Sequence, residues 1–195
     1  MANQDLIVKL REFTGAGILD CKKALDEAGG DYNAAVDVLR KKGQKVAANK
    51  QDRETKEGRV HSYIHGNGKA GALVEVLCET DFVARNEQFI QFCHEIAMHI
   101  VAAHPLYVRP EEISDDTIAK EREIYEEQMA GDTKPAEIKE KILQGKLAKY
   151  YAETCLLNQR FIMDDSKTVE QHITEMIAKI GEKIEIRRFC RFALS

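Results

Sequence analysis

A change of hydrophobic period at residues 80–86 constrains the fold of this 195-residue chain more than any other feature. Residues 72–78 are apolar, rich in β-branched side chains and partly alternating, as in a strand buried on one face. From residue 89 to residue 103, apolar side chains recur at helical spacing. The heptapeptide between them, Thr-Asp-Phe-Val-Ala-Arg-Asn, is therefore predicted to be the corner between a strand and a helix. Such a corner presents its side chains away from the core.

Two interpretations of this corner follow from its residues alone. Thr80 or Asp81 could cap the helix, with Phe82 folded back onto it as a hydrophobic staple. Alternatively, Phe82 and its neighbours Thr80, Asp81 and Val83 form a probe that is aimed at a partner. The two interpretations overlap, because a cap also fixes the direction in which Phe82 points.

The first 42 residues predict three short helices. Gly15 suits the left-handed end of the first helix, and Asp31 suits the N-cap of the third. Helices this short bury little apolar surface, so this module is expected to be marginally stable. The predicted apolar stripes are Leu6, Leu10 and Phe13; Ile18, Cys21, Leu25 and Ala28; and Ala35, Val38 and Leu39.

Leu19 falls outside these stripes. Its helical neighbours include Lys22, Lys23 and Asp26, so it stands on a polar face with no core to fill. Single exposed leucines are common in proteins, and on its own Leu19 carries little weight. Ile18 is compatible with a core position, a contact surface or both.

The rest of the chain predicts an antiparallel sheet with helices against it, an α+β fold. Asn67-Gly68 is a strong hairpin signal between two apolar strands. Residues 43–58 are charged and aperiodic, as in a hinge or an exposed helical linker. Strands are predicted at 59–65, 72–78, 106–108 and 183–194, and helices at 114–128, from Pro135 to about Leu157, and at 169–180. The predicted parts are a three-helix module at 1–45, a linker at 46–57 and an α+β core with a dimer contact at 58–195.

Several classes of function are disfavoured. A net charge of −4 argues against non-specific nucleic-acid binding. No apolar run approaches the ~20 residues that span a bilayer, and the N-terminus lacks a secretory pattern, so a cytoplasmic protein is expected. The five cysteines contain no C-x-x-C pair, which favours reduced and mostly buried thiols, although Cys190 could meet its twin across a homodimer.

Cofactor and metal sites are also not expected. The glycines at residues 66–71 match a dinucleotide-binding pattern, but a strand follows them where that site needs a helix. His61 and His65 share a strand face about 13 Å apart, too far for one ion. No catalytic motif or singled-out carboxylate pair is present, so the chain is expected not to be an enzyme.

Three blocks resemble one known family. Residues 80–86, with the strand before them, are similar to the signature of elongation factor Ts, the exchange factor for the GTPase elongation factor Tu. Residues 11–25, Arg-Glu-Phe-Thr-Gly-Ala-Gly-Ile-Leu-Asp-Cys-Lys-Lys-Ala-Leu, resemble its N-terminal signature. Residues 178–183 and then 187–189 resemble its closing block. The resemblance covers nearly the whole chain at the length of the short members, and it departs at Arg160, where Pro commonly follows Gln.

The resemblance implies a function and a set of contacts. The N-terminal module would be of the ubiquitin-associated type, and it would dock the GTPase through Ile18, Leu19, Lys22 and Lys23. The corner at Thr80, Asp81, Phe82 and Val83 would disturb the Mg²⁺ site of GDP-bound elongation factor Tu and promote GDP release. A homodimer is expected, without a cofactor, a membrane partner or direct nucleic-acid binding. The alternatives are a scaffold adaptor built on the three-helix module and a small RNA-binding ribosomal accessory.

Overall fold

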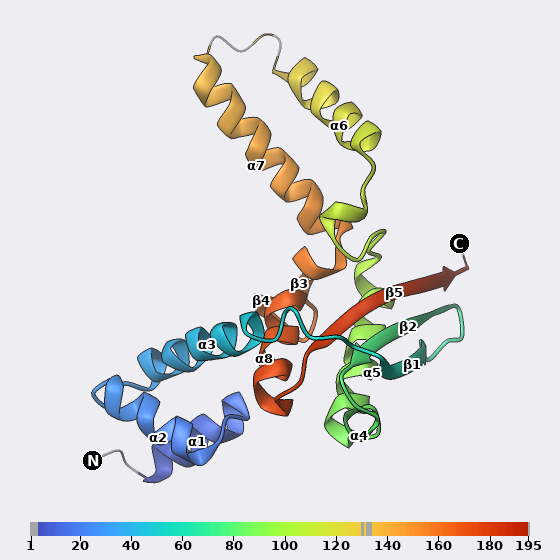
Figure 1. Cartoon of the computed structure of the whole chain (residues 1–195). Helices are drawn as coiled ribbons and strands as arrows, with labels where there is room; N and C mark the ends of the chain where they lie inside the picture. The colour runs from blue at the N-terminus through green and yellow to red at the C-terminus, as the bar shows by residue number, and fades with distance from the viewer. Residues whose placement is uncertain (1–3, 130, 132–133, 195) are drawn as a thin grey trace. The chain divides into compact units, whose positions relative to one another are not determined.

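The computed structural model describes residues 4–129, 131 and 134–194, and it has the α+β fold that the sequence predicts (Figure 1). Contacts group the chain into two compact units. The first holds residues up to 61, 75–94 and 171–187, and the second holds 62–74, 95–170 and 188 onward. The predicted boundaries at 45 and 57 remain a prediction.

Three helices form the N-terminal module, and local chemistry sets their ends. Gly15 has φ 67° and its N–H donates to the Arg11 carbonyl at 2.7 Å, so it ends the first helix in the left-handed conformation predicted. The Asp31 carboxylate accepts from the Ala34 N–H at 2.9 Å and caps the third helix. The helices are α1 (Gln4–Thr14), α2 (Ile18–Glu27) and α3 (Tyr32–Ala48). Their shared core is Leu10, Cys21, Ala24, Leu25, Ala35 and Val36.

The sequence was wrong about Phe13, and α3 extends into the region for which the sequence left open a hinge or an exposed helical linker. Phe13 is 65% exposed in the last turn of α1, where its ring is tilted against that of Tyr32 with 6.3 Å between the centroids. Helix α3 continues to Ala48, past residue 42. Residues 43–48 contain no Pro, so the backbone hydrogen bonds of the helix continue through them.

The three-stranded sheet has the order β1–β2–β5 (Figure 1). The predicted turn joins the first two strands: Gly68 has φ 68°, and its N–H donates to the His65 carbonyl at 2.7 Å. The Leu194 N–H donates to the Lys69 carbonyl at 2.8 Å, so the last residues of the chain meet the start of the middle strand and the pair is antiparallel. The strands are β1 (Glu57–Ile64), β2 (Ala70–Cys78) and β5 (Ile184–Ala193).

One face of the middle strand is buried by strict alternation. Ala72, Val74, Val76 and Cys78 are all at most 3% exposed, and the residues between them are more exposed. Further buried residues come from the helices α4 (Asp81–Ala84), α5 (Glu87–Ala103) and α8 (Val169–Ile180). The fully buried residues of α5 are Phe89, Phe92, Cys93, Ile96, Ala97, His99 and Ile100.

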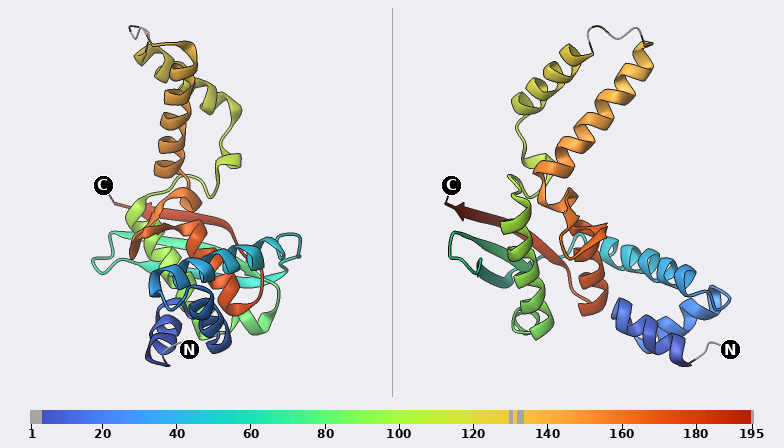
Figure 2. Two further views of the ribbon diagram at one scale, coloured as in Figure 1. Left: turned by 90° about the vertical axis from the view of Figure 1, so that its left-hand side faces the viewer. Right: turned by 180° about the vertical axis from the view of Figure 1, so that it is seen from behind.

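Residues 110–168 form a helical hairpin and a small second sheet (Figures 1 and 2). Ser114 caps the first helix of the hairpin as predicted, and its hydroxyl accepts from the Thr117 N–H at 3.3 Å. The predicted strand at 106–108 is reduced to a single bridge between Tyr107 and Cys155, and the sequence missed the two short strands that follow. The elements are η1 (Pro110–Glu112), α6 (Asp115–Gln128), α7 (Ala136–Thr154), η2 (Leu156–Asn158), β3 (Arg160–Phe161) and β4 (Asp164–Thr168).

Four cysteines are buried and Cys190 is exposed, and all five are free thiols. Over the described ranges, no helix combines the length and the apolar character needed to cross a bilayer.

Two half-buried histidines share one hydrogen bond. His61 Nε2 and His94 Nδ1 lie 3.2 Å apart with perpendicular rings, so one nitrogen donates and the other accepts. Burial, followed by the charges of His94 and Arg59, lowers the pKa of His61 from its usual value. The folded protein therefore favours neutral His61, whereas the unfolded chain protonates it more readily.

We predict that acidification from pH 7.5 to pH 5.5 destabilises the protein partly through His61. The stability from neutral His61 is fully present above its unfolded pKa of about 6.5, and it is lost as the pH falls through the lower folded pKa. Urea unfolding of His61→Gln should show a weaker loss over this interval than the original protein. His65→Gln, at an exposed position on the same sequence stretch, should not. Equal losses in all three proteins would contradict this role.

Candidate partner-binding site

The corner between β2 and α5 is built around Thr80. Its backbone is extended at φ −128° and ψ 155°, and its hydroxyl oxygen accepts from the Val83 N–H at 3.4 Å, so Thr80 is the N-cap of the single turn α4. Asp81 forms an ion pair with Arg85 at 3.1 Å on the outside of this turn. The cap that the sequence suggested is therefore Thr80, and Asp81 occupies the first turn.

Phe82 is not folded back onto the helix. Its side chain is 82% exposed, whereas Ala84, two residues on, is buried. The staple interpretation is therefore wrong, because the short turn directs residue 82 outward and residue 84 inward. Val83 is half-buried. Covering a phenyl ring of this exposure in a partner contributes roughly 1.5–3 kcal/mol.

A single carboxylate binds the start of this corner, residues 78–80, which we call its root. Glu182 accepts three hydrogen bonds: from the Glu79 N–H at 3.1 Å, from the Thr80 N–H at 3.0 Å and from the Thr80 hydroxyl at 2.7 Å. Gly181, at φ 84°, ends α8 and turns the chain so that Glu182 reaches the corner. The Thr80 hydroxyl thus donates to Glu182 while it accepts from Val83, which fixes its rotamer.

Glu79 binds the loop that carries Glu182. Its carboxylate accepts from the Lys183 N–H at 2.6 Å and from the Arg53 guanidinium at 3.1 Å. Burial acts to raise the pKa of Glu79, but the hydrogen bonds from Lys183 and Arg53 and the nearby positive charges outweigh it, and the pKa is lowered. Glu79 is therefore ionised at neutral pH. The two loops are joined in both directions, because Glu182 accepts from the N–H groups of Glu79 and Thr80, and Glu79 accepts from the N–H of Lys183.

Cys78 completes the root as a buried thiol. Burial and the charge of Glu182 raise its pKa to about 11, so it stays protonated at neutral pH. The thiol donates to the Thr80 carbonyl at 3.2 Å. Its role here is a hydrogen bond within the corner, because a protonated and buried thiol is a poor nucleophile.

The second set of predicted site residues lies at the start of α2. Leu19 is 73% exposed and Ile18 54% exposed, so Leu19 stands in solvent as its position on the polar face predicted. Lys22 and Lys23 are exposed on the following turn. Asp20, which directly follows Leu19, forms an ion pair with Lys42 of α3 and thereby joins the start of α2 to the third helix. The two sets of residues therefore occupy two different elements, α2 and the α4 corner.

Sequence reasoning missed Glu79, Glu182 and Lys183 as parts of the site. Glu182 and Lys183 stand in the closing block, but nothing in a linear sequence links them to a corner about a hundred residues earlier. Among the described residues, no group of three or more His, Cys, Asp or Glu side chains could hold a metal ion.

These features define a class of protein. A rigid, capped corner that exposes one aromatic ring is the kind of anchor that fills a pocket in another protein. An exposed leucine among lysines on a second element offers a further contact of mixed character. A factor that binds another protein through projecting side chains would need features of this kind.

Comparison with known proteins gives the family. Residues 27–176 match the family model described as elongation factor TS. Relatives named elongation factor Ts include those of Geobacter metallireducens, 55% identical over 95% of this chain and 86% of the relative, and of Thermotoga petrophila, 52% identical over 98% and 96%. The relative from Fervidobacterium nodosum is 51% identical over 97% and 96%. This chain belongs to the elongation factor Ts family, and its role is in translation elongation.

We predict that Glu182→Ala loosens the corner while the rest of the fold persists. The N–H groups of Glu79 and Thr80 lose their acceptor, which costs about 1–3 kcal/mol. Amide hydrogen exchange followed by NMR should show faster exchange at these two positions. Glu123→Ala, at an exposed position on α6, serves as the matched control. Unchanged protection of both amides in Glu182→Ala would show that this carboxylate does not hold the corner.

Proposed function

We propose that this protein is a guanine-nucleotide exchange factor that binds GDP-bound elongation factor Tu and promotes GDP release. Family membership supports the choice of partner. The observation that carries the mechanism is the 82% exposure of Phe82 on a corner held by Glu182. The factor contributes binding energy without chemistry or a cofactor of its own, and it acts in the cytoplasm without a membrane or nucleic-acid partner.

The mechanism rests on differential binding. A GTPase holds GDP through Mg²⁺, loop amides and phosphate contacts that depend on one another. A protein that binds the distorted or empty GTPase more tightly than the GDP-bound GTPase must weaken GDP binding to the same extent. Phe82 inserts between helices of the GTPase close to the Mg²⁺ site, and Thr80 and Val83 hold the turn from which it projects.

Asp81 gives the inserted turn a polar contact. Its ion pair with Arg85 is exposed, and exposed pairs are worth at most about 1 kcal/mol, so the carboxylate can exchange Arg85 for a donor on the GTPase. The start of α2 supplies the second contact, in which Ile18 and Leu19 bury apolar surface and the charges of Lys22 and Lys23 orient the module. The turn with Phe82 displaces the metal, and the start of α2 holds the partner.

We predict that Phe82→Ala slows GDP release from elongation factor Tu about a hundredfold, because roughly 3 kcal/mol of differential binding is lost. Stopped-flow release of a fluorescent GDP analogue measures this rate. Leu106→Ala, a truncation at another exposed apolar residue, should keep the original rate. An unaltered rate in Phe82→Ala would falsify insertion of this ring. No acceleration even by the original protein would favour a scaffold adaptor instead.

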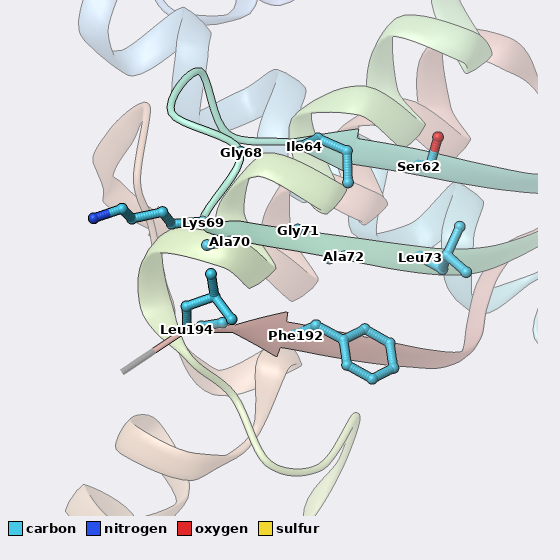
Figure 3. A pocket seen from close by; sticks show the side chains of 11 residues that line it. Ser62, Ile64, Gly68, Lys69, Ala70, Gly71, Ala72, Leu73, Phe192 and Leu194 are labelled. Atoms are coloured by element: carbon cyan, nitrogen blue, oxygen red, sulfur yellow. The ribbon is translucent and has the colours of Figure 1, made fainter.

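We also propose that the protein is a homodimer that pairs through the outer face of its sheet. A groove of about 500 Å³ runs over this face, and its large apolar side chains are Ile64, Leu73, Phe192 and Leu194 (Figure 3). All four are exposed, and among the described residues that line the groove only Lys69 is charged. A second copy offers the same apolar strip, so a two-fold contact covers both at once.

We predict that Phe192→Glu converts the dimer to a monomer, because it would place two carboxylates in a mainly apolar contact, where burial of a charge is costly. Sedimentation equilibrium at micromolar concentration gives the mass. Leu106→Glu adds the same charge at an exposed position outside the groove and should leave the dimer intact. A monomeric original protein would contradict the proposal, as would a dimer that tolerates Phe192→Glu.

A further inference from the structure

The chain that leaves the N-terminal module keeps backbone hydrogen bonds beyond α3. The N–H groups of Asn49, Lys50, Gln51 and Arg53 each donate to a carbonyl three or four residues earlier, at 3.0–3.2 Å. The sequence allowed either a hinge or an exposed helical linker in this region. A run of turns with satisfied backbone donors has fewer accessible conformations than a hinge.

The side chain of Lys183 fastens this run of turns. Its ammonium donates to the carbonyls of Gln51 at 2.8 Å and Arg53 at 2.9 Å, and the side chain is 20% exposed. A second bond joins the same two segments, in which the Lys50 ammonium donates to the Gly181 carbonyl. The linker and the turn after α8 are thus joined by charge-assisted hydrogen bonds to backbone oxygens.

The same contacts reach the root of the Phe82 corner. Arg53 donates to the Glu79 carboxylate at 3.1 Å, and the Lys183 N–H donates to it at 2.6 Å. Glu79 immediately precedes Thr80, the cap from which Phe82 projects. Lys50, Arg53, Glu79 and Lys183 form what we call the linker clasp, in which three chain segments meet.

We propose that the linker clasp holds the exit of the N-terminal module against the root of the corner, so that the α2 contact and Phe82 reach one partner as a single pre-organised surface. Lys183 is then a positioning residue for the exchange reaction. This inference rests on the proposed exchange function. Two contacts joined by a fixed connection bind more tightly than the same contacts on a loose linker, because the second contact forms at a higher effective concentration.

Lys183 allows the clasp to be tested separately from the corner. Its backbone N–H holds Glu79, whereas its ammonium holds the linker. Lys183→Met therefore keeps the bond to Glu79 and nearly the length of the side chain, while it removes both bonds to Gln51 and Arg53 and the 3.7 Å ion pair with Glu185. Lys141→Met, at an exposed position on α7, removes the same charge elsewhere and serves as the control.

The first measurement needs no partner. Trypsin cleaves after Lys50 and Arg53, and the clasp holds both residues. In Lys183→Met, cleavage at these two positions should be faster by about fivefold, because opening of the linker no longer breaks the ammonium bonds. Mass spectrometry of the first fragments gives the rates. Cleavage as slow as in the original protein and in Lys141→Met would overturn the clasp, whatever the exchange activity.

The second measurement is steady-state GDP exchange against the concentration of the GTPase–GDP complex. Lys183→Met should raise KM about fivefold and leave kcat unchanged, since the contacts remain and only their pre-organisation is lost. Faster proteolysis with an unchanged KM would overturn the positioning role, and so would a fall in kcat. Failure of the original protein to accelerate GDP release would instead refute the proposed function, and the proteolysis result would stand independently.

Discussion

The Glu182 carboxylate is the contact on which the corner depends. It binds two consecutive backbone N–H groups and the hydroxyl of Thr80, and Glu79 binds the Lys183 N–H in return. Charge-assisted bonds of this kind are stronger than neutral ones, and here they satisfy backbone donors at the end of a strand, where the ladder no longer does so. A corner of a few residues thereby keeps one conformation without a core of its own.

In this arrangement, the residues that stabilise the corner are different from the residue that we propose to bind the partner. Phe82 adds almost nothing to the fold, because its ring lies in solvent, and the polar bonds beneath it supply the order. Because the backbone that carries the ring is already ordered, less conformational entropy is lost when a partner covers the ring, so more of its burial energy appears as affinity. The same division holds at α2, where Leu19 is exposed and Asp20 ties the helix to Lys42.

The features that sequence predicted well are those with local causes. Gly15, the Asn67-Gly68 turn and the Ser114 cap depend on their immediate neighbours, and Leu19 was found because it broke a helical stripe. Sequence left open the direction of Phe82, because folding back and projecting outward differ only in tertiary contacts. It missed Glu182, whose partner Thr80 lies 102 residues earlier, and it overestimated the burial of Phe13, since a six-residue core has little room. Local propensity contains no information on such distant pairings.

The position of the Phe82 ring in a complex with nucleotide-free elongation factor Tu tests the mechanism most directly. A crystal or cryo-electron-microscopy structure of that complex should show the ring buried between helices of the GTPase beside a vacated Mg²⁺ site, with Glu182 still bound to Thr80. A ring that remains in solvent, or that lies away from the metal site, would contradict insertion of this side chain as the cause of GDP release.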